Sequence, residues 1–112
     1  MRPLDQLVAT IRQRQADADV NASYTARLLA GGVAAIGPKV TEEAAEVVEA
    51  AGEPGEAGRQ HTLREAGDLI YHLLVLLAAR RIELSEVEEH LASRFHMSGL
   101  EEKASRQPPG AP

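Results

Sequence analysis

The fold is decided by residues 65–77, which read EAGDLIYHLLVLL. After its two acidic residues this stretch is apolar on nearly every side of a helix, which marks a helix that several neighbours bury. On both sides of it, apolar residues recur at spacings of three and four, and no stretch alternates as a strand does. We therefore predict an all-α protein, a short-loop helical bundle of four to five helices.

The N-terminal half is predicted to contain three helical stretches, with the second and third separated by a pair of glycines and a proline inside the third. Apolar spacing predicts a helix over residues 3–19. Ser23 is a typical N-cap for a short second helix, which the Gly31-Gly32 pair interrupts or loosens. A long segment follows over residues 33–51, where Pro38 predicts a kink or a new helix start because proline lacks the N–H that a helix interior needs.

A glycine-rich stretch divides this half from the next helix. Residues 52–58 contain three glycines and one proline and are predicted to form a loop. His61 or Thr62 then begins the third long helix, which contains residues 65–77. We expect this helix to end near Arg80 or Arg81, whose positive charges suit the C-terminal end of a helix.

The C-terminal part is predicted to hold one short helix and a tail. Residues 85–88 fit a capping box, with Ser85 followed three residues later by Glu88, and predict a helix that ends near Arg94. Residues 98–112 become small, polar and rich in proline, which is typical of a disordered tail. The length supports a single domain, which we place at residues 1–97.

The composition removes several classes of function. The 112 residues include no cysteine, which excludes a disulfide scaffold and any thiolate metal site. Aromatic residues make up 3% of the chain, too few to stack on nucleic-acid bases. The net charge of −5 argues against sequence-independent binding to nucleic-acid phosphates. The longest apolar run is far too short for a membrane span, and no signal peptide is visible. We expect a cytoplasmic protein with an aliphatic core and with neither a nucleic-acid nor a membrane partner.

Two pairs of acids lie on otherwise apolar helix faces. Glu43 and Glu46 are three residues apart, as are Glu65 and Asp68, so each pair shares one side of its helix. Carboxylates clustered in an apolar interior need a compensating charge, and oxygen ligands favour Mg²⁺ or Mn²⁺. Because Mg²⁺ often completes its coordination with substrate phosphates, the pattern indicates chemistry on a phosphate ester or phosphoanhydride.

Each of these features also has a purely structural interpretation. A single ExxE pair more often lies on a solvated helix face, and it is the repetition on two apolar faces that favours a metal. His72 by itself is more often a hydrogen-bonded core histidine than a ligand. Lys39 fits either a phosphate contact or an ion pair with a glutamate of its own helix, and Tyr24 also fits a packing role.

The acids also resemble a known two-part motif. EExxE at residues 42–46 (EEAAE) and ExxD at residues 65–68 (EAGD) resemble the all-α, MazG-like nucleoside triphosphate pyrophosphohydrolases. More closely, the chain resembles the phosphoribosyl-ATP pyrophosphohydrolase family. The matching stretches are residues 23–28 (SYTARL), 32–46 (GVAAIGPKVTEEAAE) and 65–77, which together span most of residues 20–95.

This resemblance implies Mg²⁺-dependent hydrolysis of phosphoribosyl-ATP to phosphoribosyl-AMP and pyrophosphate, a step of histidine biosynthesis. It implies four metal ligands, Glu43, Glu46, Glu65 and Asp68. It implies that Lys39 contacts the polyphosphate and that three further residues lie near the substrate, namely Tyr24, Thr25 and His72. Glu42 and Glu46 are both candidates for the base that accepts a proton from the attacking water.

A homodimer is expected, and two other functions stay open. Four short helices bury little surface per chain, and the leucines of residues 65–77 offer more apolar surface than three neighbouring helices cover. The resemblance points the same way. A MazG-like housecleaning pyrophosphohydrolase would share the acidic motif and differ in its nucleoside triphosphate substrate. A non-catalytic helical dimerisation module would use the acids only for solvation.

Overall fold

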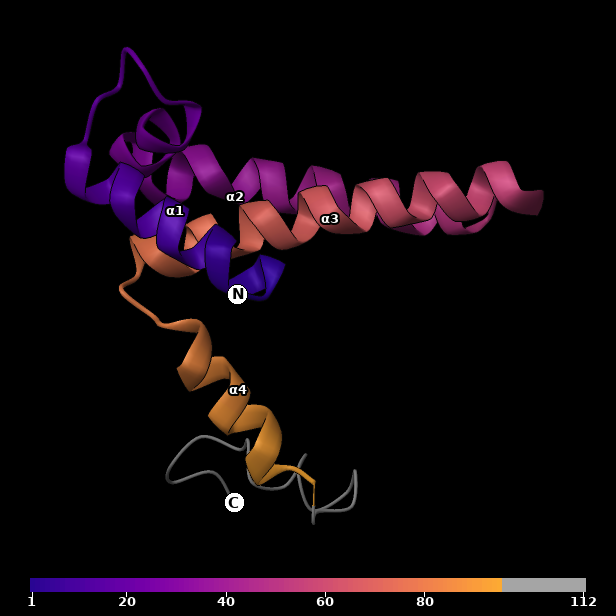
Figure 1. Ribbon diagram of the computed structural model, residues 1–112. Coiled ribbons are helices and arrows are strands. Elements are labelled where there is room, and N and C mark those ends of the chain that lie inside the picture. Colours follow the sequence, from indigo (N-terminus) through magenta and orange to yellow (C-terminus); the bar gives the residue numbers. More distant parts are fainter. Residues whose placement is uncertain (96–112) are drawn as a thin grey trace, which may run out of the picture. The chain divides into compact units, whose positions relative to one another are not determined.

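The computed structural model describes residues 1–95, which form four helices and no strand (Figure 1). They are α1 (Pro3–Asp17), α2 (Tyr24–Ala51), α3 (Gly55–Ala79) and α4 (Leu84–Ser93). The all-α prediction is therefore confirmed. None of these helices combines the length and apolar character needed to cross a bilayer. The predicted boundary at residue 97 and the tail at 98–112 lie outside the described residues.

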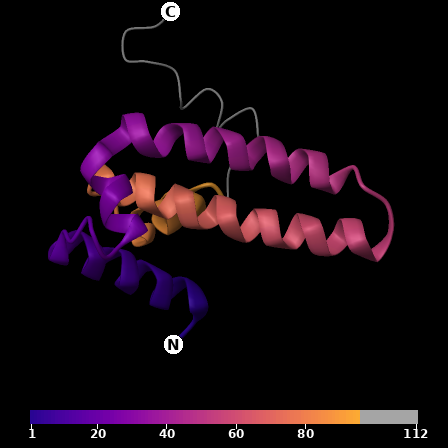
Figure 2. The same ribbon diagram turned by 90° about the horizontal axis from the view of Figure 1, so that it is seen from above.

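The chain divides into two compact units, one over residues 1–82 and one from Glu83 onward. In the first unit, α2 and α3 run antiparallel as a long hairpin, and α1 packs against both (Figures 1 and 2). The core between these helices is aliphatic, as predicted. Its fully buried members include Ile36 from α2 and Val75 from α3, which fixes the two long helices against each other.

Helix α2 begins at the predicted cap and breaks at the predicted glycines. The N–H of Ala26 donates to the Ser23 hydroxyl oxygen at 3.1 Å, which satisfies one free donor of the first turn. Gly32 has φ 66° and ψ −158°, a conformation open to glycine alone, and the helix changes direction there. The new helix start predicted at Pro38 was wrong, because Pro38 lies within the helix and the non-helical φ/ψ inside α2 is at Gly32.

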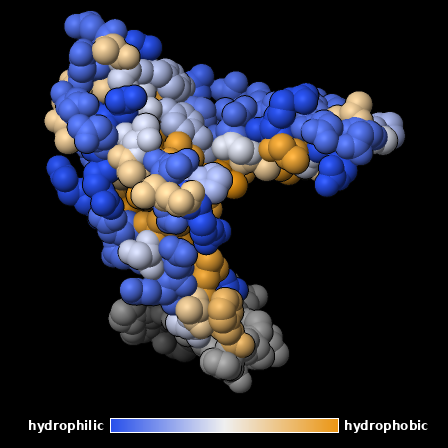
Figure 3. All heavy atoms as spheres, in the orientation of Figure 1, coloured by the Kyte–Doolittle hydropathy of each residue, from blue (hydrophilic) through white to orange (hydrophobic). Residues whose placement is uncertain are grey.

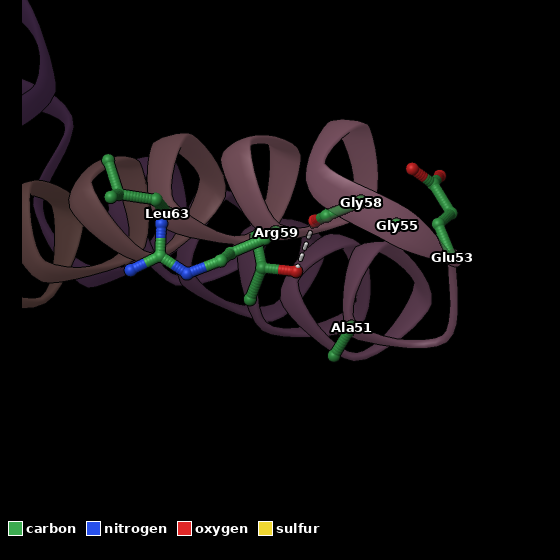
Figure 4. A pocket seen from close by; sticks show the side chains of 7 residues that line it. Ala51, Glu53, Gly55, Gly58, Arg59 and Leu63 are labelled. Atoms are coloured by element: carbon green, nitrogen blue, oxygen red, sulfur yellow. Dashed lines mark hydrogen bonds between the residues drawn. The ribbon is translucent and has the colours of Figure 1, made fainter.

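Helix α3 begins at Gly55, earlier than predicted, so most of the expected loop over residues 52–58 is a tight turn followed by helix. Gly58 explains the difference, because it is buried against the carbonyl of Glu53 and its N–H donates to Pro54 at 3.3 Å. Thr62 does not cap the helix. Its hydroxyl donates to the Gly58 carbonyl at 2.8 Å inside the helix (dashed line in Figure 4). The end at Ala79 is close to the predicted one.

Helix α4 is capped two residues earlier than predicted. Its N-cap is Glu83, and the reciprocal bonds of a capping box join Glu83 to Glu86 in place of the predicted Ser85 and Glu88. The N–H of Glu83 donates to the Glu86 carboxylate at 2.8 Å. Glutamate is not a favoured N-cap, which is why the pattern of residue types pointed to Ser85. The helix ends at Ser93, next to the predicted end.

The hairpin tip yields a stability prediction. A methyl group added at Gly58 would lie 2.2 Å from the Glu53 carbonyl oxygen, whereas one added at Gly67, on the same helix, meets nothing within 4 Å. We expect Gly58→Ala to lower the free energy of unfolding by about 1–3 kcal/mol, as overpacking does. Gly67→Ala should instead be neutral or stabilise by up to about 1 kcal/mol. Chemical denaturation of both variants measures this, and equal effects would contradict the close approach at Gly58.

Candidate active site

Three of the four predicted metal ligands meet where α2 and α3 face each other. One carboxylate oxygen from each of Glu43, Glu46 and Glu65 lies within 4.8 Å of the others. The antiparallel hairpin brings the Glu43 and Glu46 pair of α2 opposite Glu65 of α3. The side chains of Glu43 and Glu65 are 13% and 17% exposed, so this group, which we call the glutamate cluster, is largely withdrawn from solvent.

The glutamate cluster holds more negative charge than its surroundings compensate. A hydrogen bond with Glu65 raises the pKa of Glu46, and burial and the neighbouring charges of Glu65 and Glu42 raise this pKa further. A hydrogen bond with Glu43 acts in the opposite direction. One oxygen of Glu65, Oε2, is buried and has no hydrogen-bond partner. A buried carboxylate oxygen without a partner is unfavourable, and a bound cation would satisfy it.

Two predicted acids lie outside the glutamate cluster. The side chain of Asp68 is exposed and does not join the three oxygens, although its backbone carbonyl accepts a hydrogen bond from His72. Glu42 is also exposed, and its carboxylate lies 3.9 Å from the Lys39 ammonium. Lys39 is thus paired with an acid of its own helix, and its side chain is about half exposed.

His61 belongs to this region and was not predicted to. Its Nδ1 lies 2.9 Å from a Glu53 oxygen and its Nε2 lies 3.4 Å from Glu65 Oε1. The hydrogen bond with Glu53 is the main reason that the pKa of His61 is raised. The spacing of four residues between His61 and Glu65 could have indicated this contact. The prediction instead treated His61 as a helix start.

A second group of predicted residues joins the start of α2 to the middle of α3. The Tyr24 hydroxyl lies 3.2 Å from Nε2 of His72, and Thr25 forms a hydrogen bond with the hydroxyl of Tyr71. Both tyrosine rings meet the His72 ring edge-on, at centroid distances of 6.1 Å for Tyr24 and 4.9 Å for Tyr71. The other ring nitrogen of His72, Nδ1, lies 3.2 Å from Glu43 Oε1, so this group borders the glutamate cluster.

An open pocket lies elsewhere, at the hairpin tip (Figure 4). Its lining includes Arg59 and Leu63 of α3 and Glu53 of the turn. Arg59 is exposed and paired with Glu56 at 3.6 Å, so its charge is already balanced within one turn of helix. No predicted site residue is among the described residues that line this pocket. The glutamate cluster is therefore the better candidate for chemistry.

Comparison with known proteins agrees with the motif. The profile of the phosphoribosyl-ATP pyrophosphohydrolase family matches residues 4–95. A phosphoribosyl-ATP pyrophosphatase of Rhodopirellula baltica is 59% identical over 104 residues, which cover 93% of this chain and 86% of the relative. One of Jannaschia sp. is 47% identical over 106 residues, covering 95% of this chain and all of the relative.

A third relative is phosphoribosyl-ATP pyrophosphatase 1 of Bradyrhizobium diazoefficiens, 49% identical over 104 residues that cover 93% of this chain and 94% of the relative. These alignments extend over nearly the whole of each protein, so they include both helices that carry the glutamate cluster. The chain belongs to the phosphoribosyl-ATP pyrophosphohydrolase family.

Proposed function

We propose that this chain hydrolyses phosphoribosyl-ATP to phosphoribosyl-AMP and pyrophosphate, the histidine-biosynthesis step of its family. The observation that carries the proposal is the glutamate cluster, in which three acids share a largely buried space and Glu65 Oε2 has no partner. Oxygen-only ligands of this kind suit the Mg²⁺ that accompanies polyphosphate substrates. We also propose that the chain works in the cytoplasm.

The donor set fits a divalent cation. Glu43, Glu46 and Glu65 would hold it, because their oxygens already converge and their charges are only partly compensated. We propose Asp68 as a fourth ligand, since it follows Glu65 by one helical turn. When bound, Mg²⁺ neutralises phosphate charge and stabilises the charge that develops on the leaving pyrophosphate. Mn²⁺ has similar ligand preferences and would substitute for it.

Residues beside the cluster supply the remaining parts of the reaction. Lys39 is partly exposed and can exchange its Glu42 partner for a phosphate oxygen. Between the two candidate bases we favour Glu42 as acceptor of the proton from the attacking water, because its carboxylate lies outside the cluster and does not serve as a ligand. Glu46 is the alternative base. Tyr24 and Thr25 are proposed to border the substrate from the start of α2.

We further propose that two copies of the chain pair through the hairpin. Apolar side chains interrupt the mainly hydrophilic surface of the α2–α3 arm (Figure 3). Besides Tyr24, the large exposed apolar side chains on these two helices are Val33, Val48, Leu63, Ile70 and Leu73. Such a concentration of exposed apolar residues is typical of an interface between proteins.

Substrate choice tests the proposed reaction. We expect Mg²⁺-dependent release of pyrophosphate from phosphoribosyl-ATP and much slower release from ATP and the deoxynucleoside triphosphates. A phosphate-coupled assay with inorganic pyrophosphatase measures this. Preference for a deoxynucleoside triphosphate would replace this proposal with a housecleaning activity. Absence of activity on every substrate would support the non-catalytic helical module.

The metal proposal is tested by removing one charge of the cluster. Glu46→Gln relieves repulsion with Glu65, so the metal-free variant should melt at a higher temperature than the unaltered protein. The same variant should lose the rise in melting temperature that Mg²⁺ gives, and its activity should fall by at least about 10- to 100-fold. Glu49→Gln, an exposed acid of the same helix, is the matched control and should change neither property. Unchanged Mg²⁺ stabilisation in Glu46→Gln would refute the ligand role.

The interface is tested by placing a charge within it. Val48 is 75% exposed, so Val48→Glu should leave the single chain folded while separating the dimer into monomers. Val20→Glu is the control, because Val20 is also exposed, at 40%, but precedes α2. Light scattering coupled to size exclusion gives the mass of each species. A monomeric unaltered protein, or a Val48→Glu variant that stays dimeric, would count against this surface.

A further inference from the structure

His72 is the one polar or charged side chain that is buried among the described residues, with 7% of its surface exposed. Both of its ring nitrogens are in contact with polar atoms. Nδ1 lies 3.1 Å from the backbone carbonyl of Asp68 and 3.2 Å from Glu43 Oε1. Nε2 lies 3.2 Å from the Tyr24 hydroxyl. The ring therefore connects the start of α2 to a member of the glutamate cluster.

These contacts determine where the proton of the ring lies. A backbone carbonyl is an acceptor, so Nδ1 carries the hydrogen of the bond to Asp68, and Glu43 Oε1 lies 3.2 Å from the same nitrogen. In the neutral ring, Nε2 is then an acceptor, and the Tyr24 hydroxyl donates to it. Tyr24 thus favours the tautomer that places a hydrogen on Nδ1, the ring nitrogen beside Glu43 Oε1. In the charged ring Nδ1 carries a hydrogen as well, so the contact with Glu43 persists in both states.

The break in α2 is what allows Tyr24 to play this part. Tyr24 and His72 are 48 residues apart in the chain. Gly32 turns the first segment of α2 away from the direction of the second, so that Tyr24 reaches His72 while Glu43 and Glu46 lie along α3. Thr25 forms its hydrogen bond with Tyr71 beside this contact, which holds the same segment in place.

We infer that His72 is a positioning residue, whose Nδ1–H holds the Glu43 carboxylate in the orientation that lets it join Glu46 and Glu65 around a cation. Tyr24 supports it by fixing the ring through Nε2. The inference rests on the proposed metal site, and it changes the expectation for His72 from contact with the substrate to support of a ligand. Groups that orient metal ligands commonly matter to affinity nearly as much as the ligands do.

Two substitutions of His72 separate this role from simple packing. The amide nitrogen of asparagine takes nearly the place of Nδ1, whereas that of glutamine takes the place of Nε2. His72→Asn therefore keeps a donor for Glu43, and His72→Gln does not. In calorimetric titration of Mn²⁺ into the metal-free protein, we expect His72→Asn to bind close to the unaltered protein. His72→Gln should bind roughly 10- to 100-fold more weakly.

A spectroscopic measurement on the metal-free protein keeps the inference testable if His72→Gln fails to fold. The ¹⁵N chemical shifts of His72 should show a protonated Nδ1 at neutral pH. Tyr24→Phe should move the Nε2 shift and lower Mn²⁺ affinity less than His72→Gln does. A ring protonated only at Nε2 would overturn the inference.

The outcomes of the titration distinguish an error in the role of His72 from an error in the metal site itself. If the unaltered protein binds Mn²⁺ and both His72 variants bind equally well, the positioning role is wrong while the metal site stands. If the unaltered protein binds no Mn²⁺, the proposed metal site is wrong, and the role of His72 within it is overturned too.

Discussion

The site depends on three glutamates, Glu43, Glu46 and Glu65, each of which has one carboxylate oxygen within 4.8 Å of the others across two antiparallel helices. Like charges at this distance repel, and the repulsion is strengthened because Glu43 and Glu65 are largely withdrawn from water. The protein compensates in part. Glu46 shares a hydrogen bond with Glu65, His61 approaches one oxygen of Glu65, and His72 approaches Glu43. The oxygen that stays without a partner, Glu65 Oε2, shows that this compensation is incomplete.

Two glycines make the arrangement possible. Gly58 lets the turn after α2 pass close to the first turn of α3, which sets the register of the hairpin and so brings Glu46 opposite Glu65. Gly32 lets α2 change direction, which places Tyr24 beside His72. The fully buried side chains of Ile36, from α2, and Val75, from α3, then help to keep the two long helices together. The polar site thus depends on a backbone conformation at Gly32 that other residues do not readily adopt, and on the absence of a side chain at Gly58.

Much of this could be predicted from local patterns, and the errors have physical causes. Helical spacing located α1 and the end of α3, and residue type located the Ser23 cap. The two acidic pairs identified all three members of the cluster, Glu43, Glu46 and Glu65. The start of α3 was predicted too late because the glycines of residues 52–58 were interpreted as a loop. Sequence alone does not distinguish a loop glycine from one, such as Gly58, that lets two backbone segments come close together.

The spacing of residues along the chain does not predict contacts between residues that are far apart in sequence. Nothing in the order of residues shows that Tyr24 meets His72, or that the side chain of Asp68 stays exposed while Glu65 joins the cluster as predicted. Both depend on the register of the hairpin, which the close approach at Gly58 sets. Helix periodicity places Glu65 and Asp68 on one face, yet it does not say which of them points across to α2.

The most direct test of the account is an anomalous diffraction measurement on crystals grown with Mn²⁺. The account predicts one or more manganese peaks within ligand distance of Glu43, Glu46 and Glu65, with His72 still in contact with Glu43. Manganese bound only at other acids, such as Glu53 of the hairpin turn, or a glutamate cluster without manganese at saturating concentration, would contradict it.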